Sequence, residues 1–404
     1  MSRIVLAYSG GLDTSVLLKK LILEGNEVVA MTVDLGESDA IAGTGARAAL
    51  EAVRAKALAL GAYDAVLIDA RERFIAEYAF AALRANALYQ DVYPLSAALS
   101  RPLIADLLVK TAHEFGATVV AHGCTGKGND QVRIELGVRA LDPLLVCRAP
   151  LRELPLSRPD AIAFAGEHGV PIAHTAEKPY SIDANLWGRS IEAGVLEDPW
   201  NAPPEDVYAW TVSPAVVPAA EEIVVRFEGG VPSVNASTGA AMVAQLNVLA
   251  GKHAIGRIDL IEDRVVGLKS REVYECPAAT VLIGAHRALE RLVLTRDELR
   301  FKALVDRRYS ELIYDGLWMQ PLRAALEAFN ATFAPRLTGE VRLRLHCANA
   351  TVTGLRSPNG LYREQLATYG MHDTFDHQAA DGFIALQALP LEAYAASQRA
   401  PVGV

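Results

Sequence analysis

Short apolar runs alternate with longer segments of helical spacing over the first 150 residues of the chain. Each run is rich in β-branched residues and has the length of one buried strand, and the runs lie at 4–8, 28–33, 65–68, 118–121 and 144–146. The segments of helical spacing lie at 13–23, 46–60, 73–88 and 102–115. This alternation predicts a parallel sheet covered by helices on both faces, the α/β doubly wound architecture.

The pattern changes after this region. Proline-rich stretches at 148–159 and 197–218 predict connectors or ordered loops rather than helix interiors. Apolar residues that alternate on both sides of turn residues predict hairpins at 222–234, 257–270 and 340–355. Helical spacing returns at 280–294 and 298–312. The second part of the chain is therefore predicted to be α+β.

Length, charge and cysteine content exclude several classes of protein to which the chain could otherwise belong. At 404 residues the chain predicts two or three domains, since a domain has roughly 100–200 residues. The net charge of −9 disfavours a long polyanion, and no apolar stretch reaches the roughly 18 residues of a membrane-spanning helix. The start of the chain lacks the pattern of a secretory signal, so we expect a cytoplasmic protein without nucleic-acid or membrane partners. The four cysteines form no C-x-x-C pair, which argues against zinc, redox and disulfide motifs.

Two glycine-rich polar loops follow predicted strands, SGGLDTS at 9–15 and HGCTGKGNDQ at 122–131. Ligands of doubly wound sheets bind beyond the carboxyl ends of the strands. In the first loop, glycines and the free amides of a helix start can cradle a phosphate, whereas Asp13 would repel it unless Mg²⁺ bridges the two. The plain alternative is that Gly10 and Gly11 only turn the chain and that Asp13 only caps the helix. Neither a dinucleotide fingerprint nor a conventional P-loop is present.

The S-G-G-x-D-[ST] signature at 9–14 resembles the PP-loop pyrophosphatases, which split ATP between its α- and β-phosphates. Together with the stretches 122–136, 180–199 and 250–278, residues 7–15 are similar to the argininosuccinate synthase family. The resemblance implies an ATP-dependent ligase of arginine biosynthesis that joins L-citrulline and L-aspartate to argininosuccinate. In that reaction citrulline attacks the α-phosphorus, pyrophosphate leaves, and aspartate then displaces AMP from citrullyl-AMP.

The resemblance also implies a domain organisation. We expect an α/β nucleotide-binding domain at 1–165, an α+β synthetase domain at 166–375, and a short C-terminal helical segment at 376–404 that helps to form a homotetramer. ATP is expected as a substrate together with Mg²⁺, and no metal site formed by the protein alone is expected.

Each substrate is assigned residues by the same resemblance. The ATP-binding positions are Ala7, Tyr8, Ser9, Gly10, Gly11, Leu12, Asp13, Thr14, Ser15, Val33 and Gly123. The aspartate-binding positions are Thr125, Asn129 and Asp130. The citrulline-binding positions are Tyr93, Asn129, Arg133, Ser181, Ser190, Glu262 and Tyr274. An arginine suits a carboxylate through a bidentate pair, and a glutamate suits an ammonium group.

The chain departs from the family pattern at several positions. Ala97 and Ala98 stand where a hydroxyl residue is usual, and Val33, Cys124, Asp263 and Glu272 also replace the more common residues. No departure removes a charged ligand group. His122 is a tempting general base, but a histidine at a strand end is more often structural, so no general base is named.

Two other functions are consistent with the first loop alone. One is a different PP-loop adenylating enzyme, either tRNA-thiolating or amidating, and the other is a non-catalytic nucleotide-binding sensor. The charge of −9 and the missing C-x-x-C pair count against a tRNA modifier, and no block supplies the ammonia-generating nucleophile of an amidating enzyme. A sensor would leave the stretches at 122–136 and 180–199 without a role.

Overall fold

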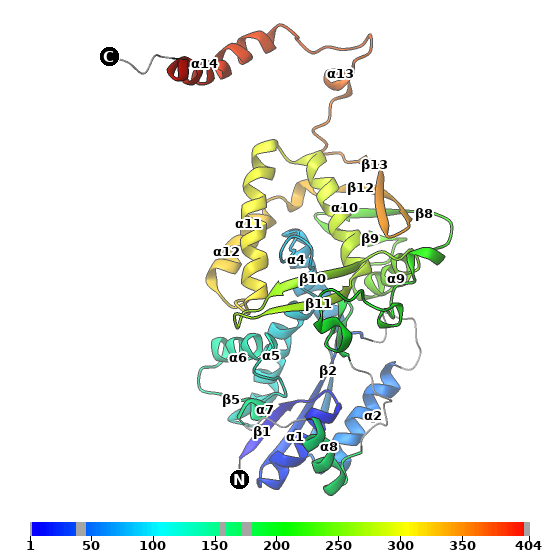
Figure 1. The fold of residues 1–404 in the computed structure, drawn as a ribbon, viewed down its shortest axis with the longest axis vertical. Helices are drawn as coiled ribbons and strands as arrows, with labels where there is room; N and C mark the ends of the chain where they lie inside the picture. Colours follow the sequence, from blue (N-terminus) through cyan, green and yellow to red (C-terminus); the bar gives the residue numbers. More distant parts are fainter. Residues whose placement is uncertain (1, 38–45, 154–157, 172–179, 400–404) are drawn as a thin grey trace. The chain divides into compact units, whose positions relative to one another are not determined.

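Figure 1 shows the computed structural model of the chain, which describes residues 2–37, 46–153, 158–171 and 180–399. Two compact units are present, Met1–Asn359 and Gly360–Val404. The first unit contains three sheets and all the predicted site residues.

The first sheet is parallel and has the strand order β3-β2-β1-β4-β5. Its strands are β1 (Arg3–Ala7), β2 (Glu27–Asp34), β3 (Asp64–Asp69), β4 (Val119–Ala121) and β5 (Val146–Arg148). The predicted doubly wound fold is thus confirmed. Because β1 pairs with both β2 and β4, the loops after β1 and β4 leave the sheet side by side at its topological switch point.

Helices cover both faces of this sheet because its strands are apolar on both faces. Ile4 and Leu6 of β1 pack with α1 (Leu12–Leu23), α2 (Ala46–Ala59) and α8 (Arg158–Glu167). Val5 lies on the other face, in the core that includes α5 (Ser96–Glu114). All three of these β1 side chains are at most 1% exposed.

Two helix predictions and one connector prediction need correction. The segment predicted as one helix at 73–88 consists of α3 (Arg71–Arg73), a π-helix (Phe74–Ala79) and α4 (Phe80–Arg84). The helix predicted at 102–115 begins six residues earlier, at Ser96, and holds Pro102 in its interior, although proline is commonest in the first turn. The stretch at 148–159, predicted to be a connector, contains α7 (Pro150–Glu153) and the start of α8, while residues 154–157 lie outside the described part. A proline in a first turn is compatible with a helix, which is why the proline-rich pattern misled.

The second part of this unit contains two antiparallel sheets, as predicted for an α+β region. One has the order β10-β11-β7-β6 and consists of β6 (Ser181–Asn185), β7 (Gly188–Glu192), β10 (Arg257–Asp263) and β11 (Lys269–Glu275). The other has the order β13-β12-β8-β9 and consists of β8 (Glu221–Glu228), β9 (Val231–Val234), β12 (Gly339–His346) and β13 (Asn349–Arg356). All three predicted hairpins are confirmed.

The remaining helices of the first unit are α6 (Asp130–Leu141), α9 (Gly239–Gly251), α10 (Pro277–Val293), α11 (Arg296–Tyr314) and α12 (Pro321–Ala331). The stretch at 197–218 is irregular, as predicted, with short 3-10 turns at Glu205–Val207 and Pro214–Val216. The second unit contains α13 (Glu364–Ala367) and α14 (Ala379–Arg399). No helix among the described residues is long and apolar enough to span a membrane.

The β6–β7 hairpin is anchored to the start of α5, which joins the antiparallel sheet to the parallel one. Trp187 at the tip of the hairpin is fully buried, and its indole N–H donates to the carbonyl of Pro94 at 3.1 Å. The Asn185 amide donates to the carbonyl of Ser96 at 2.9 Å. These bonds bring the antiparallel sheet over the carboxyl-terminal edge of the parallel sheet.

Candidate active site

The loop at residues 9–15 joins β1 to α1 and has the form that a phosphate cradle requires. Gly10 has φ +78°, a conformation that favours glycine, and an added Cβ would lie 2.8 Å from a methyl group of Val53. Gly11 is the N-cap residue, and no side chain caps the helix. Asp13 lies exposed in the first turn of α1 and is not the N-cap residue of this helix.

Hydroxyl groups and one lysine surround this loop. The hydroxyls of Ser9 and Thr14 lie 3.1 Å apart, as do those of Tyr8 and Ser15. The ammonium group of Lys56, from α2, donates to the carbonyl of Gly10 at 2.8 Å. Burial lowers the pKa of Lys56 from its ordinary value. The loop therefore combines free helix-start amides with hydroxyl donors and a nearby cation.

Gly123, directly beyond β4, lies against the same loop. An added Cβ at Gly123 would lie 3.0 Å from the methyl group of Thr14. Val33 is partly exposed near the end of β2, the strand next to β1. The structure thus brings the predicted ATP-binding positions of β1, α1 and β4 together at the switch point, with Val33 on the neighbouring strand.

A cavity of about 130 Å³ lies between α5, α6 and the antiparallel sheet. Its lining includes every predicted citrulline-binding residue and two of the three predicted aspartate-binding residues, Asn129 being assigned to both: Tyr93, Asn129, Asp130, Arg133, Ser181, Ser190, Glu262 and Tyr274. Thr125 is not in the lining and lies exposed on the loop before α6. Side chains from distant parts of the chain therefore converge on one small polar site.

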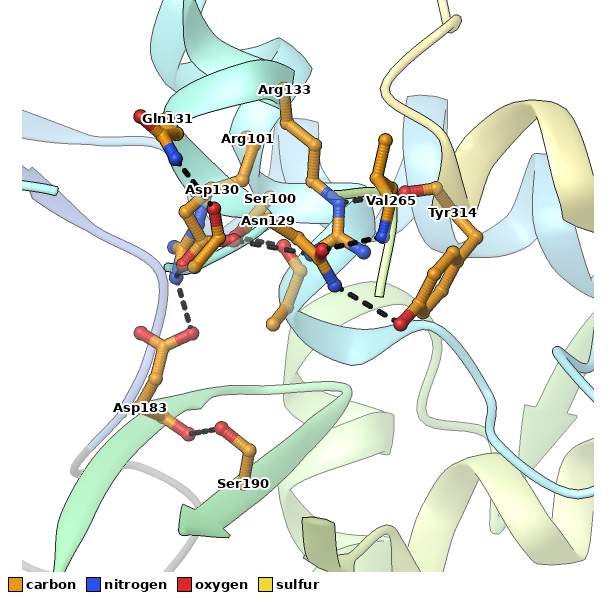
Figure 2. Close-up of polar contacts among 12 residues, drawn as sticks. Ser100, Arg101, Asn129, Asp130, Gln131, Arg133, Asp183, Ser190, Val265 and Tyr314 are labelled. Atoms are coloured by element: carbon orange, nitrogen blue, oxygen red, sulfur yellow. Dashed lines mark hydrogen bonds and ion pairs between the residues drawn. The ribbon is translucent and has the colours of Figure 1, made fainter. Parts of the chain in front are cut away.

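Arg133 supplies a buried cation at this cavity, and Figure 2 shows its surroundings. Its Nε donates to the carbonyl of Tyr314 at 2.9 Å, and its Nη1 donates to Asp130 at 3.1 Å. The side chain is only 4% exposed, and its Nη2 has no hydrogen-bond partner among the described residues. A buried, unpaired guanidinium N–H group is costly unless a ligand satisfies it.

Glu262 on β10 supplies a buried anion at the same cavity. The Tyr314 hydroxyl donates to one carboxylate oxygen at 2.5 Å, and the Tyr274 hydroxyl donates to the other. Burial raises the pKa of Glu262, and the two tyrosine hydroxyls oppose this effect. Tyr274 in turn stacks on Tyr93 with ring centroids 4.0 Å apart, so the cavity has one flat aromatic wall.

Ala97 and Ala98 stand where the family usually has a hydroxyl residue, yet the Tyr93 hydroxyl still has a hydrogen-bond partner. The backbone N–H of Ala97 donates to that hydroxyl at 3.0 Å, and Ser96 lies 3.5 Å from it. Because α5 begins at Ser96, this amide is one of the free donors of the helix start. The backbone N–H of Ala97 therefore supplies this hydrogen bond to Tyr93, and no hydroxyl side chain is needed for it.

Two family models match the chain. The arginosuccinate synthase N-terminal HUP domain matches residues 3–171, and the arginosuccinate synthase C-terminal domain matches residues 180–394. The chain belongs to the argininosuccinate synthase family. The argininosuccinate synthase of Gloeobacter violaceus is 51% identical over 97% of this chain and 98% of its own length, and that of a Synechococcus species is 51% identical over 98% of both.

Among solved structures, a 4-thiouridine synthetase in complex with RNA and ATP is similar over 42% of this chain and 41% of its own length, with 17% identity and a TM-score of 0.31. A similarity of this size carries no argument about function. The family membership therefore rests on the family models and on the curated relatives.

For this member of the argininosuccinate synthase family, the structure adds charged residues that the sequence analysis did not single out. Arg101 of α5 donates to Asp130 at 2.7 Å and to Asp183 of β6 at 2.6 Å, as Figure 2 shows. Burial pushes the pKa of Asp130 up, but Arg101 and Arg133 outweigh burial and lower this pKa to about 2. Asp130 is therefore a carboxylate held between two guanidinium groups.

A second charged group closes another side of the cavity. Arg264 donates to Glu272 at 2.7 Å and also pairs with Glu192 of β7. It reaches the loop before α6 as well, where it donates to the carbonyl of Lys127 at 3.1 Å. Burial and the charge of Glu192 raise the pKa of Glu272 to about 8, against the effect of Arg264. No sequence motif links Arg264, Glu272 and Glu192, which meet because β10, β11 and β7 are neighbours in one antiparallel sheet.

His122 has the environment of a structural residue. It is 1% exposed, and its Nδ1 accepts a hydrogen bond from the Cys124 amide at 3.2 Å. Its Nε2 lies 3.4 Å from Glu135, and interactions with His122 and Arg152 lower the pKa of that carboxyl group to about 2. His122 does not line the cavity.

Proposed function

We propose that this chain condenses L-citrulline with L-aspartate at the expense of ATP, through citrullyl-AMP, and releases argininosuccinate, AMP and pyrophosphate. The observation that carries the proposal is the convergence of all seven predicted citrulline-binding residues on one cavity of a chain of the argininosuccinate synthase family. The relatives named above carry the name argininosuccinate synthase, which supports the same reaction here.

For ATP, we propose that residues 7–15 bind the nucleotide with Val33 and Gly123. The free amides at the start of α1 and the hydroxyls of Ser9 and Thr14 face the pyrophosphate part, while the buried hydroxyl of Ser15 donates to the Gly10 carbonyl at 3.3 Å and supports the loop from behind. Asp13 is exposed in the first turn of α1 and has no side-chain hydrogen bond among the described residues, so its carboxylate fits a role in holding Mg²⁺. The ion would neutralise charge on the leaving pyrophosphate.

For citrulline, we propose that its two charged ends pair with the two opposite buried charges of the cavity. The unpartnered Nη2 of Arg133 binds the carboxylate, and Glu262 binds the α-ammonium group. Ser181 and Ser190 add hydroxyl partners, and the stacked rings of Tyr93 and Tyr274 form the apolar wall.

For aspartate, we propose the loop that leads into α6. Thr125 and Asn129 donate to its carboxylates, while Asp130 accepts from its ammonium group. The ionised state of Asp130, maintained by Arg101 and Arg133, supports this role. Asn129 borders the citrulline cavity as well, so it stands between the two amino acids.

In both chemical steps, the main task of the protein is to position the reactants. The ureido oxygen of citrulline forms a bond to the α-phosphorus as the bond to pyrophosphate breaks. The amine of aspartate next bonds to the ureido carbon, AMP leaves, and the amine loses a proton. Holding the reactants in line supplies much of the rate enhancement, because phosphoryl transfer leaves little covalent work for side chains.

We also propose a homotetramer and the domain division 1–165, 166–375 and 376–404. The large apolar side chains of α14 support an oligomeric role, because Phe383, Leu386 and Leu391 are each more than 60% exposed. Light scattering of the purified protein tests the tetramer, and a monomeric mass at micromolar concentration would refute it.

Pyrophosphate release tests the reaction. Purified protein is incubated with Mg-ATP, citrulline and aspartate, and each amino acid is omitted in turn. We expect sustained release that requires both amino acids, with AMP formed in equal amount. Release that needs neither amino acid but needs tRNA would favour a thiolating enzyme, and ATP binding without turnover would favour a nucleotide sensor.

A further inference from the structure

Tyr314, the last residue of α11, contacts three of the predicted substrate-binding residues but is not itself one of them. It is fully buried. Its hydroxyl lies 2.5 Å from Glu262 and 3.0 Å from the amide nitrogen of Asn129, and its backbone carbonyl accepts from Arg133 at 2.9 Å. Figure 2 shows Tyr314 beside Asn129 and Arg133.

The hydroxyl determines how Asn129 is oriented. A phenol has one proton, and here the proton is donated to the carboxylate of Glu262. The same oxygen can then only accept from Asn129, so the NH₂ group of that amide must face Tyr314. The Asn129 carbonyl oxygen correspondingly accepts from the backbone N–H of Val265 at 2.9 Å. One N–H of the Asn129 amide remains to donate to a substrate.

Two neighbouring side chains hold the ring of Tyr314 in place. It stacks on Tyr89 with centroids 3.4 Å apart and an interplanar angle of 3°. The guanidinium carbon of Arg133 lies over the ring, 4.8 Å from its centroid, and makes a cation–π interaction with it. Replacing only the hydroxyl would therefore leave the ring contacts and the backbone bond to Arg133 intact.

We propose that Tyr314 is a positioning residue that orients Glu262 and Asn129 for the two amino-acid substrates. The inference rests on the proposed function. Through one hydroxyl, Tyr314 links the carboxylate that receives the citrulline ammonium group to the amide that borders both amino acids. Through its backbone, it also sets the direction of the guanidinium group that receives the citrulline carboxylate.

The hydroxyl also influences the protonation of Glu262. This carboxylate must be ionised to bind an ammonium group, and a hydrogen bond to the ionised form favours that form. The groups that face or act on it are Tyr274 and Glu272 of β11, Arg264 beyond β10, Arg133 of α6, Tyr314 of α11, and Tyr89 and Tyr93 before α5. Loss of the Tyr314 hydroxyl removes one of the two tyrosine donors and raises the pKa of Glu262.

Tyr314→Phe tests the inference, with Tyr309→Phe as the matched control. Tyr309 lies in the same helix, is also fully buried, and its hydroxyl has no hydrogen-bond partner among the described residues. In Tyr314→Phe we expect the KM for citrulline to rise roughly 10- to 100-fold, as for a lost hydrogen bond to a charged group, while the KM for ATP changes by less than about twofold. The acidic limb of the pH profile of kcat/KM for citrulline should move to higher pH.

The outcomes separate this inference from the proposed function. Wild-type turnover with an unchanged citrulline KM and an unshifted acidic limb in Tyr314→Phe would overturn the positioning role alone. Equal effects of Tyr309→Phe would also overturn it, because they would indicate a general effect of α11. Absence of wild-type turnover would overturn the proposed function and this inference with it. KM and the position of the acidic limb do not depend on the amount of folded enzyme, so partial unfolding cannot imitate the expected result.

Discussion

Arg101 offers a direct test of how the two parts of the first unit are joined at the site. Its guanidinium group is 11% exposed and pairs with Asp130 of α6 and Asp183 of β6. In Arg101→Met the aliphatic stem is retained and the charge is lost. Asp183 then loses its ion pair with Arg101, and Asp130 retains its bond to Arg133 at 3.1 Å.

The expected loss of stability follows from these contacts. Arg101 and Arg133 together lower the pKa of Asp130 from an ordinary value of 3.8 to about 2. At about 1.4 kcal/mol for each pH unit, this net lowering, which burial opposes, corresponds to about 2 kcal/mol, and Arg101 is one of its two cationic sources. The two carboxylates are 31% and 39% exposed, so solvent weakens both pairs. We therefore expect Arg101→Met to reduce the free energy of unfolding by about 1–2 kcal/mol.

The sign of the pH dependence is also determined. Because the pKa of Asp130 is lower in the folded protein, its stabilising effect is present above pH 3.8 and is lost as the pH falls toward 2. The difference in stability between wild type and Arg101→Met should thus be largest near neutral pH. It should shrink below about pH 4.

Urea denaturation at pH 7 and pH 3 measures this difference. Arg226→Met serves as the control, because Arg226 is 69% exposed and pairs only at the surface with Glu340, at 3.1 Å. The control should cost at most about 0.5 kcal/mol. Equal stability of the two variants at pH 7 would refute the reasoning, since it would mean that the partly buried pairs of Arg101 contribute no more than a surface pair.

Three further predictions concern the phosphate loop, the approach to Arg133 and a buried ion cluster. Asp13→Ala should abolish pyrophosphate release but keep the wild-type melting temperature, and retained turnover would contradict the role in holding Mg²⁺. Gly316→Ala should lower stability by about 1–3 kcal/mol and raise the citrulline KM, since Gly316 has φ +78° and an added Cβ would lie 2.9 Å from Arg133 Cα. Lys302→Met leaves the buried Glu290 and Asp306 without their cation and should cost about 3–5 kcal/mol at pH 7.5 in urea denaturation. Burial already raises the pKa of Asp306 to about 6, so this cost should be smaller at pH 5, where the carboxyl group is protonated, and an equal cost at both pH values would contradict the account.

Much of the fold was predictable because it depends on local patterns. The five strands of the parallel sheet were located to within one or two residues, since strands buried on both faces read as short apolar runs. The helix starts were less predictable. Pro102 suggested a first turn, whereas α5 begins at Ser96, where bonds to Asn185 and Tyr93 hold the backbone. Tertiary contacts of this kind override the local signal.

The sequence by itself determined the alternation of strands and helices, the glycine loop after β1 and, through its resemblance to a family, the residues assigned to each substrate. Only the tertiary structure decided the roles of Arg101, Tyr314 and Arg264. Arg101 and Asp183 are 82 residues apart in the chain, and Asn129 and Tyr314 are 185 apart. Such pairs have no local periodicity that a pattern could detect, because they exist only once the antiparallel sheet and α11 pack over the edge of the parallel sheet.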